Sequence, residues 1–199
     1  IQTLDSAEIG ALTSAQIAKM TGTQMAALGT AVIPGLNTDA LAAIPTKILQ
    51  QMSTAQIAVL TTAQAQSLTT GQIANLLVKQ VAALPSKDLA VLTTAQAIAL
   101  TTPQIAGLST AQIPAFEQTF LAAITAAKIV ALDSSQIAAF SSAQLRALTT
   151  AQIAALTVTS GTKDGFTATR LNYLTESQFQ SVSTVALLAL STAQVAAIA

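Results

Sequence analysis

The sequence predicts an all-α protein: a solenoid, or superhelix, of short two-turn helices with one helix in each eight-residue repeat. Two observations support this prediction. A large apolar residue recurs every eight positions from Leu4 to Leu156 without a slip of register. A residue that can cap a helix, usually Thr, Ser or Asp, follows most of these apolar residues, and a Gln often stands three positions later. If the recurring apolar residue is position one, the consensus repeat reads Leu-Thr-Thr-Ala-Gln-Ile-Ala-Ala.

The residues of one repeat match the parts of a capping box. In the repeat that begins at Leu148, the hydroxyl of Thr149 can accept a hydrogen bond from the amide of Gln152. The Gln side chain can reach back to the cap amide, while Leu148 and Ile153 supply the apolar contact that accompanies such a box. We therefore expect a helix to begin near position two of most repeats.

A Gln occupies position five in most repeats, and three roles are compatible with it. It can close the capping box, form a ladder of side chains along the solenoid, or contribute to a polar interface with another chain. The capping box is the favoured interpretation because it accounts for the Gln and the preceding Thr together.

Helices of about six residues are not stable alone in water, so they must gain stability by packing. Positions one and six are large and apolar in nearly every repeat, and we expect them to be buried between stacked helices. One continuous helix is excluded, because a stripe with an eight-residue period would rotate around its axis. A parallel β-helix is the alternative, since short fixed periods also suit stacked strands, but Ala and Gln favour helix.

A second period of forty residues is visible in repeats that depart from the consensus. Residues 44–52 and 84–92 share a Pro at position two and a Lys at position four, and Lys128 lies near the same place in a third block. Pro34 and Pro114 are eighty residues apart. Either five repeats complete one superhelical turn or return to one contact face, or a block of five repeats was duplicated without geometric meaning.

The repeat register breaks after Leu156. We predict a single domain in which residues 1–156 form the solenoid, residues 157–173 form an inserted loop, and residues 174–199 resume the repeats. A loop inserted into a solenoid can be a binding element, although it can also be a tolerated surface insertion. The candidate interaction residues of this loop are Lys163, Asp164, Phe166, Arg170 and Tyr173.

The composition argues against several classes of function. Lys and Arg together number 8, as do Asp and Glu, so no excess positive charge is available to bind nucleic acid. The chain has no Cys or His, the usual ligands of zinc and haem, and its carboxylates are scattered. A run of about 18 apolar residues could span a membrane, but the sequence contains no such run. We expect no catalytic residues, no cofactor and no metal.

The string Leu148-Thr-Thr-Ala-Gln-Ile-Ala-Ala-Leu156 resembles octapeptide repeats of large bacterial exported proteins of the adhesin-like or haem-utilisation/adhesion-like kind. The resemblance implies a secreted or cell-surface location and a structural role, and it carries no active-site residues. The string is also similar to the first helix of transcription-activator-like effector repeats. The second helix and the base-reading loop of that family are missing here, and the capping chemistry alone accounts for the similarity.

The expected function is therefore that of an extracellular structural protein: a self-associating filament subunit, or a surface-layer or adhesin component. The array closes on a plain repeat, Ser191-Thr-Ala-Gln-Val-Ala-Ala-Ile-Ala199, without a polar cap, which favours head-to-tail association. Because the sequence starts at Ile1, we expect a mature product or a part of a longer array. The alternative is a scaffold that binds a protein or glycan through one face and the 157–173 segment.

Overall fold

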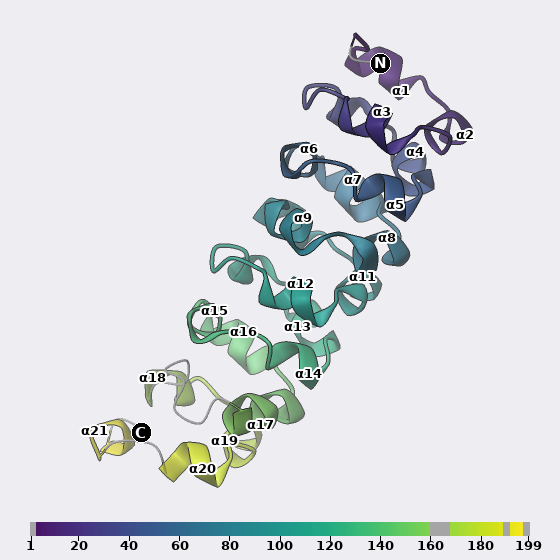
Figure 1. The fold of residues 1–199 in the computed structure, drawn as a ribbon. Helices are drawn as coiled ribbons and strands as arrows, with labels where there is room; N and C mark the ends of the chain where they lie inside the picture. The colour runs from purple at the N-terminus through teal and green to yellow at the C-terminus, as the bar shows by residue number, and fades with distance from the viewer. Residues whose placement is uncertain (1–2, 160–167, 189–191, 197–199) are drawn as a thin grey trace. The chain divides into compact units, whose positions relative to one another are not determined.

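The computed structural model describes residues 3–159, 168–188 and 192–196, which form short helices joined by turns. No strand occurs among these described residues, so the protein is an all-α solenoid and the parallel β-helix alternative is excluded. The chain divides into two compact units, Ile1–Leu100 and Thr101–Ala199, and each is described by itself. Figure 1 shows the succession of short helices within each unit.

The first unit consists of helices with closely similar lengths. They are α1 (Ser6–Gly10), α2 (Ser14–Ile17), α3 (Gly22–Ala26), the 3-10 helix η1 (Ile33–Gly35), α4 (Thr38–Ala43), α5 (Thr46–Leu49), α6 (Thr54–Ala58), α7 (Thr62–Ser67), α8 (Thr70–Asn75), α9 (Val78–Ala83), α10 (Ser86–Ala90) and α11 (Thr94–Ala99).

The second unit repeats the same pattern, with one longer helix. Its helices are α12 (Thr102–Ala106), the 3-10 helix η2 (Ile113–Ala115), α13 (Gln118–Ala123), α14 (Ala126–Ile129), α15 (Ser134–Ala138), α16 (Ser142–Ala147), α17 (Thr150–Thr159), α18 (Ala168–Leu171), α19 (Glu176–Gln180), α20 (Thr184–Leu188) and α21 (Thr192–Ala196).

The helices are shorter than the predicted two turns. Apart from α17, the α-helices contain four to six residues, which is little more than one turn at 3.6 residues per turn. The extended residues between successive helices explain why the helices are shorter than predicted. Around α8, the N-cap Thr69 and the C-cap Leu76 both have extended backbone, with ψ angles of 157° and 142°. Two non-helical residues in each repeat leave at most six residues for the helix.

The core contains the residues that the repeat pattern predicts. Every position-six residue from Ile9 to Ile153 is buried, and so is every position-one residue from Met20 to Leu156. Leu4 and Leu12, in the first two repeats, are half-buried. The prediction that positions one and six form the core is confirmed, because these two rows of side chains point between stacked helices.

Each helix packs against the helix three repeats further along. In the first unit α4 contacts α7 and α7 contacts α10, while in the second unit α13 contacts α16 and α14 contacts α17. Because α4 begins at Thr38 and α7 at Thr62, one coil of the solenoid spans 24 residues. The interpretation that five repeats complete one superhelical turn is therefore wrong, and the forty-residue period does not correspond to a coil.

Two repeats form a 3-10 helix where the others form an α-helix. These helices, η1 and η2, contain Pro34 and Pro114, each at position seven of its repeat. Proline lacks the backbone amide that an α-helix needs at this point and clashes with the carbonyl four residues earlier. The α-helical hydrogen-bond pattern therefore cannot continue through position seven, and a 3-10 turn replaces it.

Candidate functional site

The corner between two successive helices is the most regular polar feature of the molecule. Before α8, the Gln72 Oε1 atom accepts a hydrogen bond from the amide of Thr69 at 2.8 Å, and the Thr69 hydroxyl accepts from the Gln72 amide at 3.1 Å. The Gln72 Nε2 atom donates to the carbonyl oxygens of Leu41 and Ile44, both at 2.9 Å. One side chain thus caps the start of its own helix and the end of α4.

The same arrangement recurs at position five through both units. The accepting carbonyls usually belong to residues 28 and 31 positions earlier, at the end of a helix in the preceding coil. The capping-box prediction is confirmed, and the same Gln side chains also donate to backbone carbonyls of the preceding coil. The Gln residues that make this connection include Gln56, Gln64, Gln72, Gln80 and Gln96 in the first unit and Gln136, Gln144, Gln152 and Gln178 in the second.

The shortness of the helices explains why this side chain matters. The first four amides and the last four carbonyls of any α-helix have no partner within the helix, so a six-residue helix leaves most of its polar groups unpaired. A buried polar group without a partner costs about 1–3 kcal/mol. The Gln side chains satisfy groups at both kinds of helix end, and they are almost fully buried.

Other side chains can make the same connection where position five is not Gln. Ala40 occupies that position in α4, and the N-cap Asn37 substitutes for the missing amide. The Asn37 Oδ1 atom accepts from the amide of Ala40 at 2.7 Å. Its Nδ2 atom donates to the carbonyl of Leu12 at 3.2 Å and to that of Gly10 at 3.4 Å. The corner contact is thus retained with a different residue.

Arg170 has the corresponding role in the second unit. Its Nη1 atom donates to the carbonyls of Ile137 at 2.9 Å and Phe140 at 3.3 Å, and its Nη2 atom donates to the carbonyl of Ala138. These carbonyls lie at the end of α15. Partial burial lowers the pKa of the Arg170 guanidinium, and the neighbouring Tyr173 acts in the opposite direction.

The hydrogen bonds of Gln178 show how many residues the coil before it contains. Its Nε2 atom donates to the carbonyls of Leu145 and Leu148, which lie 33 and 30 residues earlier. The corresponding separations elsewhere are 31 and 28 residues. This coil therefore contains two residues more than a regular coil, and the corner contact is formed despite the break in register.

The structure describes two of the five residues predicted to form an interaction loop. Arg170 lies in α18, and the carbonyl of Tyr173 accepts a hydrogen bond from Arg146 Nε at 3.0 Å. Lys163, Asp164 and Phe166 lie outside the described residues. The described parts of the 157–173 segment include the end of α17 and all of α18. Binding of a partner by this segment stays a prediction.

The first coil carries position-five side chains that differ in exposure from those of later coils. Glu8, Gln16 and Gln24 close capping boxes on their own helices, yet all three are exposed. The Gln16 Oε1 atom accepts from the amide of Thr13 at 2.8 Å, as its counterparts do elsewhere. In later coils the corresponding Nε2 atom donates to carbonyls of the preceding coil, and we call this contact the joint between coils. The Nε2 atoms of Gln16 and Gln24 therefore give the exposed surface of the first coil the same chemistry as a buried joint.

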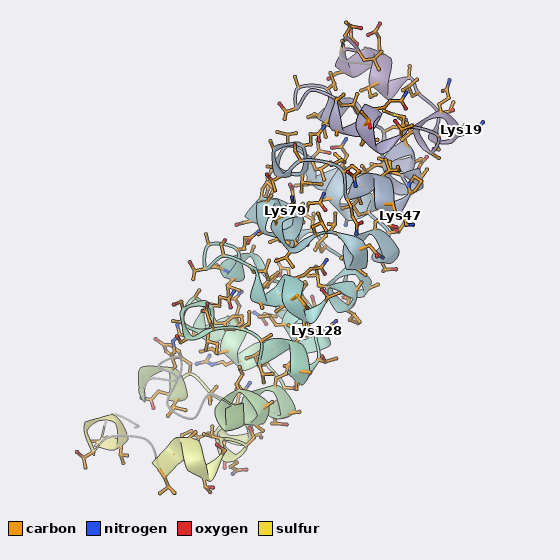
Figure 2. The ribbon with its side chains drawn as sticks, in the orientation of Figure 1. Lys19, Lys47, Lys79 and Lys128 are labelled. Atoms are coloured by element: carbon orange, nitrogen blue, oxygen red, sulfur yellow. The ribbon has the colours of Figure 1, made fainter. Side chains whose placement is uncertain are left out.

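Charged side chains are dispersed over the surface. Lys19, Lys47 and Lys79 of the first unit are exposed and belong to different helices or their ends (Figure 2). Within the described ranges, no group of three or more acidic residues is arranged to hold a metal ion. None of the described helices has the length and apolar character needed to cross a membrane.

Comparison with known protein families identifies a repeat in the chain. No curated protein matches the chain. The family described as the ALTTAQ repeat matches residues 81–118 and again residues 121–158. The two matches begin forty residues apart, so the forty-residue period is a unit of sequence repetition, whereas the coil spans three repeats. The chain thus contains two segments similar to the ALTTAQ repeat.

Proposed function

We propose that the chain is a structural protein that self-associates by stacking its coils on those of another copy. The observation that carries the proposal is the recurring contact between coils, in which Gln56 Nε2, for example, donates to the carbonyls of Met25 and Leu28 at 2.9 and 2.8 Å. The exposed side chains of Gln16 and Gln24 carry the same amide donor. The joint that connects coils within the chain supplies the chemistry needed to connect copies.

The charge distribution supports the same proposal. The chain carries 8 basic and 8 acidic residues, so copies have no net charge that would oppose association. A head-to-tail contact of this kind uses two different surfaces and produces an open filament when the rotation does not close a ring. Such growth adds coils in the geometry already present within each unit.

Replacement of both exposed Gln side chains by Glu tests the proposal. Gln16→Glu and Gln24→Glu preserve the acceptor of each capping box but replace the outward amide donor by an oxygen that repels a carbonyl. We expect wild-type protein to form concentration-dependent oligomers in sedimentation velocity and filaments in electron microscopy, and the double variant to remain largely monomeric. Gln66→Glu is the matched control, because Gln66 is exposed but lies outside position five. Wild-type protein that stays monomeric at about 1 mM would contradict the proposal.

The proposed location is the exterior of a bacterial cell, as a filament, surface-layer or adhesin component. The support is the resemblance of the Leu148–Leu156 string to repeats of exported adhesin-like proteins. An epitope-tagged chain in its native host should be degraded when intact cells are treated with protease. Protection of the tag in intact cells, with degradation only after lysis, would show that the protein is inside the cell.

A further inference from the structure

Asp88 occupies position five of its repeat, where most repeats have Gln. It is the third residue of α10, and its relative exposure is 0%. Neither Asp88 carboxyl oxygen has a hydrogen-bond partner, and these are the only buried side-chain polar atoms without one among the described residues. The N-cap of α10 is Pro85, which has no amide to donate to the carboxyl group. Asp88 is thus a fully buried acid at a joint between coils.

The neighbouring repeats show what surrounds this position. Gln80 Nε2 donates to the carbonyls of Leu49 and Met52, and Gln96 Nε2 donates to those of Ala65 and Leu68. By the same separations of 31 and 28 residues, the carbonyls that correspond to Asp88 belong to Ile57 and Leu60. An ionised carboxylate has no hydrogen to donate to these oxygens. A neutral carboxylic acid has one.

Few charged groups could stabilise an ionised carboxylate here. Lys87 precedes Asp88 on the same helix, but its side chain is exposed. Helix α7, Thr62–Ser67, packs against α10 and contains no ionisable side chain, and neither do residues 53–61 before it. A buried charge without a close partner is strongly unfavourable. The Asp88 carboxyl group therefore stays protonated until the pH is high enough for deprotonation to offset the free-energy cost of burying the charge.

We propose that Asp88 makes the solenoid sensitive to protons: the neutral acid is compatible with the closed joint between coils, and its ionisation weakens the packing of α10 on the preceding coil. This role is separate from self-association at the first coil. Burial raises the pKa of the Asp88 carboxyl group, and Lys87 lowers it to a smaller degree. In the unfolded chain the pKa returns to about 3.9.

The sign of the effect follows from proton linkage. Between the unfolded pKa and the higher folded pKa, the folded protein binds more protons than the unfolded chain. Stability therefore falls as the pH rises through this window and then stays at the lower level. The chain contains no His or Cys, so no other side chain ordinarily titrates between about pH 6 and 8.

The test compares wild-type protein with Asp88→Asn, which retains the size of the side chain, supplies an amide donor and cannot ionise. The urea midpoint is measured by circular dichroism from pH 4 to pH 9. We expect the midpoint of Asp88→Asn to exceed that of wild type by an amount that grows as pH rises above 4. Asp39→Asn removes an exposed acid from α4 and should follow the wild-type curve. Parallel curves for wild type and Asp88→Asn would overturn the proposal.

A second measurement on unmodified protein keeps the proposal testable if the variant does not fold. Carbon-13 NMR of the Asp88 carboxyl group should give a titration midpoint well above 3.9 in the folded protein. A midpoint near 3.9 would refute the proposal. Sodium, potassium and calcium chlorides are also compared at pH 9 and constant ionic strength. A cation-specific rise in the wild-type urea midpoint would show that an ionised Asp88 is paired with that cation, which also overturns the proposal.

Discussion

The substitution Gln72→Glu isolates the contacts between coils from the capping box. The Oε1 atom of Gln72 accepts from the amide of Thr69, and a Glu at the same position can retain that bond. The Nε2 atom donates to two buried carbonyls at the end of α4, and a Glu cannot do this while ionised. Gln16→Glu is the matched control, because Gln16 makes the same capping box but is exposed. Both variants are compared at a dilution at which the wild-type protein is monomeric, so that association does not contribute to stability.

The expected loss of stability follows from two limits. If the new carboxyl group stays ionised, two buried carbonyls lose their donor, at about 1–3 kcal/mol each, and a charge is buried as well. If it becomes protonated instead, one donation is restored. Keeping a Glu of ordinary pKa about 4.3 neutral at pH 7 costs about 4 kcal/mol. The other carbonyl still lacks a donor, so the protonated form costs about 5–7 kcal/mol in total and sets an upper limit. We expect Gln72→Glu to lower the free energy of unfolding by about 4–7 kcal/mol at pH 7.

Urea unfolding followed by circular dichroism at 222 nm gives the global change, and amide hydrogen exchange of α4 and α8 gives the local one. Hydrogen exchange is needed because stability in repeat proteins is approximately a sum of local terms. Gln16→Glu should change stability by less than about 0.5 kcal/mol. The loss in Gln72→Glu should shrink as the pH falls toward 4. Equal losses in the two variants, or a loss without pH dependence, would refute the reasoning.

Three further outcomes are expected. Gly35→Ala should cost about 1–3 kcal/mol, because a Cβ atom there overlaps the backbone of α1, whereas Gly29→Ala has open space and should be nearly neutral in thermal unfolding. Ile73→Asp should cost about 4 kcal/mol or more, since Ile73 is fully buried, while Thr69→Ala should cost about 1 kcal/mol, the usual value of a cap, in the same urea assay. Arg170→Met should cost about 1–3 kcal/mol and increase hydrogen exchange near α15; unchanged exchange there would contradict its role.

The repeat could be understood from local chemistry. Leu148, Thr149, Gln152 and Ile153 interact within six residues, so their spacing alone predicts the capping box and the start of a helix. The burial of positions one and six also follows from the sequence, because helices this short are stable only when their apolar residues are covered. Helical class, helix starts and core were therefore predictable.

The connections between coils depend on where separate repeats meet in space. Gln72 can donate to Leu41 and Ile44 only because a coil contains three repeats, and no local pattern specifies that number. One signal was present: a capping box accepts Glu as well as Gln, yet Glu8 is the one Glu at position five of the repeats from Leu4 to Leu156. The preference for an amide reflects its donor.

The sequence by itself determined the helical repeat, its caps and its core, because these depend on contacts within about eight residues. The tertiary structure decided the number of repeats in a coil, the second role of the Gln side chains and the positions of Arg170 and Asp88 at joints between coils. Those features join residues about 30 positions apart, where the angle between successive helices sets which groups meet. That angle results from the packing of all the buried side chains together.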